Sequence, residues 1–263
     1  MPSPTYLSIK NAHLRDQYIT FEEGPHIYTV CGERGTYTSV TTWNHHHFSK
    51  FDAEKIIDGM LANPRNINDT NWKYRGMTKD EIKKMWADNG AAASGSGTGM
   101  HNDIECYYNK MSVQNDSIEF QYFLQFVKDF PDLVPYRTEW MVYYEELKIS
   151  GSIDMVFENP DGTIQIYDWK RVKEIKHEAS FGKYALTDCI SHLPDTNFWH
   201  YALQLNVYKT ILEHKYGKKV TDLFLVCIHP ENQYKTYERI KVPFLDKEIA
   251  DLVKERLHEV SKQ

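Results

Sequence analysis

Cysteine is scarce in this 263-residue chain. The four cysteines are Cys31, Cys106, Cys189 and Cys227, and no two of them form a C-x-x-C pair. Zinc ribbons, iron–sulfur clusters and disulfide frameworks need paired or closely spaced cysteines, so the sequence supports none of them. Scattered thiols indicate an intracellular, reducing compartment, which includes the cytoplasm, the nucleus and an organelle matrix.

Long hydrophobic runs are also missing. No apolar stretch approaches the roughly 20 residues of a membrane-spanning helix, and the first residues, Met1–Pro4, do not begin a signal peptide. We therefore expect no membrane partner. Hydrophobic residues make up 41% of the chain and charged residues 26%, which are ordinary proportions for a globular protein with a buried core.

Positive charge is not in excess, since the chain carries a formal net charge of −6. Nucleic-acid-binding domains are commonly basic, so the overall charge argues against that class. A local basic cluster nevertheless follows Lys170. Such a cluster is usually a solvated face, but Arg171, Lys173 and Lys176 are candidates for contacts with nucleic-acid phosphates.

A phosphate-binding loop is missing as well. Residues 91–99 are small and glycine-rich, but no G-K-[ST] sequence ends the stretch, which excludes a Walker-type nucleotide site. We expect this stretch to permit close packing or the close approach of a ligand backbone.

The histidine tract at residues 45–47 does not predict a metal site. Three adjacent residues of a regular element point in different directions, so they cannot all face one ion. A solvated loop, or a wall of a DNA channel, is the better interpretation.

The most informative stretch is a predicted β-hairpin. Residues 151–157 alternate apolar and polar side chains, residues 159–162 (Asn-Pro-Asp-Gly) have the composition of a tight turn, and residues 163–170 have the pattern of a second strand.

This hairpin brings charged side chains together. Because side chains alternate along a strand, Asp168 and Lys170 share one face while Trp169 points to the other. Asp154 lies on the partner strand, near enough across the ladder to share a site with Asp168.

Two converging carboxylates repel each other, and a divalent cation relieves that repulsion. Carboxylates without cysteine favour a hard ion, Mg²⁺ or Mn²⁺. A lysine beside such an ion can orient an attacking water or neutralise charge in phosphoryl transfer. These groups are typical of a phosphodiesterase, although a lone D-x-K motif is more often a solvated hairpin.

The order of predicted elements indicates an α/β fold with a mixed central β-sheet flanked by helices. Residues 1–75 read as short strands, the last of them over residues 36–42, followed by a helix over residues 51–60 and a polar loop over residues 63–71. We interpret this part as an N-terminal β/α elaboration. Thr78, with Glu81 three residues later, predicts a capping box that begins a helix through Trp86. Residues 76–263 contain the hairpin and would form the core on which that elaboration packs, giving one compact unit.

A helix predicted over residues 100–111 adds polar groups near the hairpin. His101 and Glu105 fall on the same face of this helix. A lone helical histidine is more often structural than a ligand, so its role depends on the hairpin. We expect Glu105 to support His101 as an outer hydrogen-bond acceptor rather than bind a metal directly.

A second helix, predicted over residues 198–216, carries Gln204 and Tyr208 one turn apart, so both can face the sheet. A buried glutamine needs hydrogen-bond partners, and Asp168 or Lys170 would supply them.

These motifs follow one another in a definite order: G-T-G-M-H with a glutamate four residues on, then Glu139, G-S-I-D, D-W-K and Q-x-x-x-Y. From Gly97 to Tyr208 the series resembles the PD-(D/E)xK nuclease superfamily. Within it, the closest likeness is to the RecB-like exonuclease branch, which includes Cas4 and the mitochondrial genome maintenance exonuclease. The fold this implies is a restriction-endonuclease-like core; the N-terminal part matches only loosely.

The resemblance implies a metal-binding set. His101, Asp154, Asp168 and the backbone carbonyl of Trp169 would bind one or two Mg²⁺ or Mn²⁺ ions, and Glu139 is a less certain ligand. Some members of the branch hold an iron–sulfur cluster through one early and three closely spaced late cysteines. No late triplet exists here, so no iron–sulfur cluster is expected.

The resemblance also implies a catalytic set. Lys170 would be the catalytic lysine, acting with Asp154 and Asp168. Gln204 and Tyr208 would orient that lysine or contact the scissile phosphate.

The implied function is that of a metal-dependent DNA exonuclease in DNA replication, repair or recombination. Its partner would be DNA with a free end, single-stranded or frayed. Two alternatives stay open: a non-catalytic nucleic-acid-binding subunit of the same fold, and a structure- or sequence-specific endonuclease. The motifs do not distinguish the polarity of digestion or identify protein partners.

Overall fold

The computed structural model describes residues 4–179 and 182–262. The chain divides into two compact units, one made of Met1–Ser49 with Met100–Gln263 and the other of Lys50–Gly99. This division differs from the predicted boundary near residue 75. Within the first 49 residues, a short strand pairs with the main sheet and a helix packs against that sheet. This is why these residues group with the later part of the chain.

The larger unit is built on one six-stranded sheet, which is mixed as the sequence predicted. Its strands, in chain order, are β4 (Thr38–Ser39), β5 (Val134–Tyr144), β6 (Ile149–Glu158), β7 (Ile164–Lys170), β8 (Val220–Cys227) and β9 (Glu238–Val242). β6 and β7 form the predicted antiparallel hairpin, and β8 joins β7 in parallel. β9 pairs antiparallel with β8, while β5 pairs antiparallel with β6. A separate antiparallel sheet contains β1 (Ile19–Glu22), β2 (Ile27–Val30) and β3 (Glu33–Arg34).

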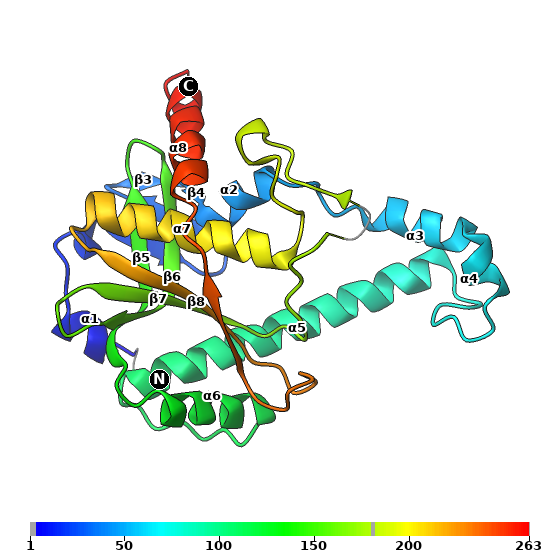
Figure 1. Ribbon diagram of the computed structural model, residues 1–263, viewed down its shortest axis with the longest axis horizontal. Coiled ribbons are helices and arrows are strands. Elements are labelled where there is room, and N and C mark those ends of the chain that lie inside the picture. Colours follow the sequence, from blue (N-terminus) through cyan, green and yellow to red (C-terminus); the bar gives the residue numbers. More distant parts are fainter. Residues whose placement is uncertain (1–3, 180–181, 263) are drawn as a thin grey trace. The chain divides into compact units, whose positions relative to one another are not determined.

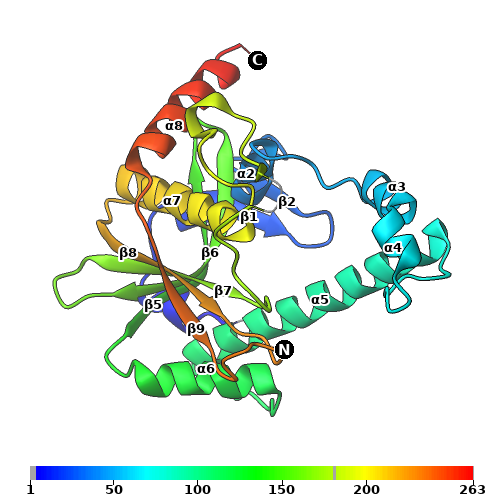
Figure 2. The same cartoon turned by 45° about the vertical axis from the view of Figure 1, so that its right-hand side comes forward.

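Helices cover both faces of the main sheet. They include α2 (Val40–His46), the end of α5 (Lys79–Tyr108), α6 (Ile118–Asp129), α7 (Asn197–Lys215) and α8 (Asp246–Val260). Figures 1 and 2 show α7 across one face and α6 across the opposite face. No helix in the described ranges combines the length and the apolar character needed to cross a bilayer.

Each face of the sheet has its own hydrophobic core. On the α7 side, Leu203, Val207 and Ile211 pack in a cluster with sheet residues. On the α6 side, Phe123 and Phe126 pack in a second cluster, which also holds the tryptophan of β7. The near-continuous apolar run of β8 is explained by this arrangement, because a central strand is buried on both sides.

The pairing of β6 opens in the middle of the strand. Along one edge, Ile149 and Ser150 pair with β4, whereas the ladder with β7 begins only at Met155. β4 and β7 therefore diverge, and the four residues 151–154 lie in the fork between them. Asp154 is at the end of this fork, which frees its side chain from a regular cross-strand pair.

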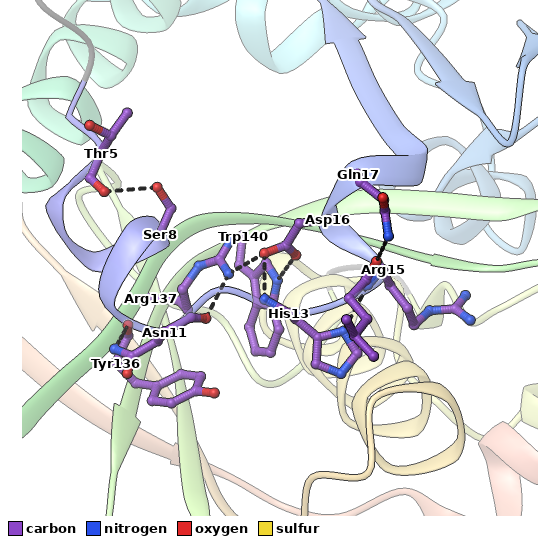
Figure 3. Close-up of polar contacts among 11 residues, drawn as sticks. Thr5, Ser8, Asn11, His13, Arg15, Asp16, Gln17, Tyr136, Arg137 and Trp140 are labelled. Carbon is purple, nitrogen blue, oxygen red and sulfur yellow. Dashed lines mark hydrogen bonds and ion pairs between the residues drawn. The ribbon is translucent and has the colours of Figure 1, made fainter.

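The N-terminal segment is fastened to β5 by polar contacts (Figure 3). The Asp16 carboxylate accepts hydrogen bonds from the Arg137 guanidinium at 2.6 Å, the Trp140 indole at 3.0 Å and the His13 backbone N–H at 2.9 Å. The Asn11 side chain donates to a backbone carbonyl of β5 at 2.7 Å. These contacts hold the segment between the short helix α1 (Tyr6–Lys10) and β1 against the core.

The smaller unit contains α3 (Ala53–Ala62), α4 (Pro64–Asn68) and most of α5. Thr78 and Glu81 form the predicted capping box, since the Glu81 carboxylate accepts from the Thr78 backbone N–H at 2.7 Å. Lys79 forms ion pairs with Glu54 and Asp58 of α3.

Two local predictions within residues 1–75 were wrong. Residues 36–42 were expected to be β, but α2 begins at Val40, where Ser39 caps it by accepting from the Thr42 N–H at 3.1 Å. Residues 63–71 were expected to be a loop, but residues Pro64–Asn68 form a short helix capped by Asn63.

Candidate metal and catalytic site

The end of β7 places charged and apolar side chains on opposite faces. Trp169 is 1% exposed and packs edge-on against Phe123 and Phe126, with ring centroids 5.7 and 5.3 Å apart. Trp169 therefore packs in the core on the α6 side of the sheet. Asp168 and Lys170 consequently face the α7 side together, as strand alternation predicts.

Asp168 and Lys170 form a buried ion pair. Nζ of Lys170 lies 2.7 Å from Oδ2 of Asp168. The Lys170 side chain is 17% exposed and the Asp168 side chain 2%. Burial raises the pKa of Asp168 to about 7, with Lys170 opposing the rise. Burial disfavours the charged form of Lys170, but the nearby Asp168 and Asp154 carboxylates outweigh it and raise the lysine pKa. The lysine therefore stays charged in the neutral range.

His101, near the end of α5, is oriented by the backbone of β7. Its Nε2 lies 2.9 Å from the Trp169 carbonyl oxygen. A carbonyl only accepts hydrogen bonds, so Nε2 carries the proton in this contact. The other ring nitrogen, Nδ1, lies 3.5 Å from both Glu139 Oε1 and Asp154 Oδ2.

These three residues form a group suited to a cation. One ligand atom each from His101, Glu139 and Asp154 lies within 4.8 Å of the other two. One imidazole nitrogen and two carboxylates are donors that a hard or borderline divalent ion accepts. The hydrogen bond from the far nitrogen of His101 to a carbonyl is the usual support of a metal-binding histidine. The donor set therefore fits a divalent metal.

The backbone at this group departs from regular strand geometry. Glu139 has a φ of +40°, an uncommon conformation for a residue with a side chain. On β6, Ile153 belongs to the core on the α7 side, whereas Met155 belongs to the opposite core. The two-residue alternation is thus broken at Asp154. Backbone irregularities of this kind are common next to functional sites, where they turn a side chain toward the site.

The group places two carboxylates beside one imidazole, and their charge shifts the pKa of neighbouring groups. The Asp154 and Glu139 carboxylates raise the pKa of His101 to about 9, although burial opposes the charged ring. Burial, followed by the charge of Glu139, raises the pKa of Glu105 to about 7. Glu105 lies one turn beyond His101, and its outer supporting role stays a prediction. The site attracts protons where no cation is bound.

Asp168 and the Trp169 carbonyl, both predicted as ligands, do not belong to the group formed by His101, Glu139 and Asp154. Asp168 is not among the three ligand atoms that lie within 4.8 Å of one another in the described residues, and its carboxylate is paired with Lys170. The Trp169 carbonyl accepts the His101 hydrogen bond, while the Trp169 N–H donates to Asp154 Oδ2 at 3.0 Å. Both groups adjoin the cation site, and their role as ligands stays a prediction.

Gln204 and Tyr208 lie on the face of α7 that meets the site. Tyr208 is 3% exposed and fills the fork of β6, where its ring lies against Gly151. Burial raises the pKa of Tyr208 well above its ordinary value, so its hydroxyl stays protonated. Gln204 lines a pocket together with Lys170.

The predicted basic cluster is neutralised by acidic partners. Arg171 pairs with Glu119 of α6 at 2.7 Å, with both side chains less than one-fifth exposed. Lys173 pairs with Glu231, and Lys176 lies 3.7 Å from Glu174. Arg171 thus links β7 to α6, and contacts of these three residues with nucleic acid stay a prediction.

Several residues around Lys170 were not predicted from the sequence. The ammonium of Lys170 lies 4.6 Å from the centre of the Tyr201 ring. Tyr201 precedes Gln204 by three residues, so helical periodicity was a signal for it. The histidine tract is split: His45 lines the pocket beside Lys170, whereas His47 is buried and bonds Thr187 at 2.9 Å. Asn44 also lines this pocket, and no motif marks it.

Comparison of the chain with family models, curated proteins and solved structures identifies its family. Residues 70–263 match the family model of the PD-(D/E)XK nuclease superfamily. No curated protein matches the chain significantly. The crystal structure of SSO0001 is 13% identical, with 54% of this chain and 58% of that chain covered and a TM-score of 0.29. The chain thus spans less than two thirds of that structure.

A second solved structure, of a Eubacterium rectale protein described as a candidate exonuclease, is 14% identical. The match covers 61% of this chain and 71% of that chain, with a TM-score of 0.27. At such scores neither structure establishes a fold or an activity for this chain. The family model, in contrast, covers more than half of the chain, and the protein therefore belongs to the PD-(D/E)XK nuclease superfamily.

Proposed function

We propose that this protein is a divalent-metal-dependent DNA exonuclease of the RecB-like branch, acting from a free end in replication, repair or recombination. The observation that carries the proposal is the approach of His101, Glu139 and Asp154 to within 4.8 Å of one another, beside the buried pair of Asp168 and Lys170. Superfamily membership supports the coarser statement of a nuclease that uses a divalent metal.

The cation would be held by His101, Glu139 and Asp154, with Asp168 and the Trp169 carbonyl as adjoining donors. Nitrogen and carboxylate ligands without thiolate favour Mg²⁺ or Mn²⁺. A divalent cation bound here supplies polarisation of a phosphoryl oxygen and a lower pKa for a water molecule.

Lys170 supplies the chain's own positive charge. Its ammonium is held between the Asp168 carboxylate and the Tyr201 ring and remains partly exposed. From there it can donate a hydrogen bond to the attacking water or to an oxygen of the scissile phosphate. The water oxygen would bond to phosphorus as the P–O3′ bond breaks. A 5′-phosphate and a 3′-hydroxyl remain, with the proton of the water ending on the departing oxygen.

The test is digestion of 5′- and 3′-labelled single- and double-stranded DNA oligonucleotides, and of closed circular DNA, with Mg²⁺ or Mn²⁺. We expect degradation of linear DNA from an end, no cleavage of the circle, and no activity with a chelator. Asp154→Asn and Lys170→Met should each lower the rate by about 100-fold or more. Lys247→Met, an exposed lysine on α8, is the matched control and should leave the rate unchanged.

Each alternative has its own outcome. Cleavage of the closed circle as fast as of linear DNA would show an endonuclease. Binding of DNA without divalent-dependent cleavage would show a non-catalytic subunit. Wild-type rates in both Asp154→Asn and Lys170→Met would remove the proposed site.

A further inference from the structure

The smaller unit, Lys50–Gly99, contains four aromatic rings in contact with one another. Phe51 meets Trp86, Trp86 meets Tyr74, and Tyr74 meets Trp72, with ring centroids 5.9, 6.2 and 5.7 Å apart. The Trp86 indole N–H donates to the Tyr74 hydroxyl at 2.9 Å. The two central rings are therefore held in a fixed orientation, with Phe51 and Trp72 at the ends of the series.

These rings are not the core of the unit. The side chains of Ile57 and Ile82 are completely buried in it, at 0% exposure each. Phe51, in contrast, is 72% exposed, and the other three rings are only partly buried. A single exposed ring needs no explanation, but contiguous exposed apolar groups mark an interaction surface. The ring series is such a surface.

Basic residues alternate with the rings. Residues 72–75 read Trp-Lys-Tyr-Arg, and the Lys73 ammonium lies 5.3 Å from the centre of the Tyr74 ring. The unit has eight basic and seven acidic residues, although the whole chain carries a net charge of −6. Among the described residues, five of these eight form no ion pair, unlike the basic cluster after Lys170. The five are Lys50, Lys55, Arg65, Lys73 and Arg75.

Local hydrogen bonds hold this alternating segment in place. The Asp69 carboxylate accepts from the Asn71 backbone N–H at 2.8 Å, and the Arg75 backbone N–H donates to the Trp72 carbonyl at 3.0 Å. The segment between α4 and α5 is thus a series of turns rather than an extended linker. Its rings and cations are presented together before any ligand binds.

The combination of rings and free cations indicates the class of ligand. Aromatic side chains stack on the faces of unpaired bases, and lysine and arginine contact the phosphates between them. A duplex keeps its base faces inside its own stack, so it cannot use the rings. An apolar protein surface would cover the rings but would leave the unpaired cations without a partner.

We propose that Phe51, Trp72 and Tyr74, with Lys73 and Arg75, form a binding site for single-stranded nucleic acid. The rings stack on unpaired bases, and the two cations contact neighbouring phosphates. None of these residues belongs to the metal or catalytic groups, so the site goes beyond the proposed cleavage and needs no divalent cation. Because every base has a flat face, binding here is tolerant of sequence.

The experiment measures binding of a fluorescein-labelled oligothymidylate of about 20 nucleotides to the full chain by anisotropy, with a chelator present to prevent cleavage. Phe51→Ala and Trp72→Ala should each weaken binding about tenfold. Trp72→Phe keeps a ring and should bind nearly as well as the wild type. Phe51→Ala removes an exposed ring, so its fold should be intact, which far-UV circular dichroism checks. Tyr234→Ala, at a 57% exposed tyrosine of the larger unit, is the matched control and should bind normally.

The salt dependence tests the two cations. Each phosphate contact in a single strand contributes about 0.7 to the slope of log affinity against log salt concentration. The double variant Lys73→Gln with Arg75→Gln should therefore reduce this slope by about 1.4. Lys247→Gln with Lys254→Gln removes the same charge from two exposed lysines of α8 and should leave the slope unchanged.

The outcomes separate this site from the proposed nuclease. Wild-type affinity in both Phe51→Ala and Trp72→Ala would overturn the assignment and favour a protein as the partner of the rings. An equal loss for the single strand and for a duplex of the same length would also overturn it. Ring-dependent binding without divalent-dependent cleavage would end the nuclease proposal and leave this site standing. Cleavage by a protein whose binding ignores both ring variants would overturn this site alone.

Discussion

The hydroxyl oxygen of Tyr208 lies 2.8 Å from the position that a Cβ atom on Gly151 would occupy, and ring atom Cε1 lies 2.9 Å from it. Tyr208 thus fills the fork of β6, in direct contact with bare backbone. Gly151 is needed there for space rather than for backbone freedom. The contact couples α7 to the strand that carries Asp154.

Replacement of Gly151 by alanine should therefore destabilise the protein. The added methyl group meets a rigid, buried ring, and overpacking of this kind costs about 1–3 kcal/mol. The free energy of unfolding, measured with denaturant, should fall by this amount. Because the strand or the ring must shift, Mn²⁺ affinity at the neighbouring Asp154 should fall as well.

A double-mutant cycle isolates this contact. Tyr208→Leu alone removes packing, but in combination with Gly151→Ala it relieves the clash. The double mutant should therefore lose less free energy of unfolding than the two single mutants lose in total. Gly162→Ala is unsuitable as a control because Gly162 has a φ of +81°. Gly24→Ala, with open space around it, should have little effect. Full additivity would mean that Tyr208 does not press on Gly151.

Asp16→Ala should destabilise the larger unit more than its partial exposure suggests. The change leaves the guanidinium of Arg137, 6% exposed, without its carboxylate partner. Loss of one partner of a buried pair costs about 3 kcal/mol, which would lower the Tm by roughly 5–10 °C in a protein of this size. Glu22→Ala removes an exposed pair with Arg34 and should leave the Tm nearly unchanged. Equal effects would contradict this interpretation of Asp16.

The hairpin at the centre of the sheet was predictable because its signals are local. The turn composition marks residues 159–162, and the alternation after it puts Asp168 and Lys170 on one face. The helix that carries Gln204 and Tyr208 was predictable for the same reason. The family assignment needed only the order of such motifs.

Features that depend on tertiary contacts were not predictable. The sequence suggested two helices separated by the glycine-rich residues 91–99, but α5 runs unbroken from Lys79 to Tyr108. Glycine lowers helix propensity without forbidding helix, so local preference misplaced this boundary. Glu139 has a strained backbone and aims at the site from β5, and nothing in its neighbours along the chain signals that geometry.

Asn44 shows the same limit for the pocket. Its neighbours in sequence, the histidine tract, suggested a solvated loop, and only the packing of α2 beside α7 reveals a buried amide. A pattern can predict that a helix face is buried, but it cannot predict which polar group on that face is left without a partner.

His47 makes stability depend on pH. Burial lowers its pKa from 6.5 to about 4, so the folded state binds the proton less readily than the unfolded chain. Its contribution is therefore complete above about pH 6.5 and is lost as the pH falls toward 4, a change of about 3 kcal/mol for a shift of this size. Unfolding free energies of the wild type and His47→Gln, measured between pH 4 and 7.5, give the difference curve that isolates this residue. A flat difference curve would show that His47 is accessible to protons in the folded state.

Metal binding should release protons and strengthen as the pH rises. The Asp154 and Glu139 carboxylates hold the pKa of His101 at about 9, and burial raises the pKa of Asp168 and Glu105 to about 7. A ligand must lose its proton to bind a cation, so protons compete with metal below these values. The affinity for Mn²⁺, measured by calorimetry, should rise between about pH 6 and 9.

Calorimetry in buffers of different ionisation enthalpy counts the protons released. At pH 7.5 His101 is still protonated in the metal-free protein, so about one proton should leave per bound Mn²⁺. In His101→Ala the release should fall toward zero and the affinity should drop. His192→Ala, an exposed histidine paired with Glu248, should behave like the wild type. Unchanged proton release and affinity in His101→Ala would show that the His101 ring is not a ligand of the cation.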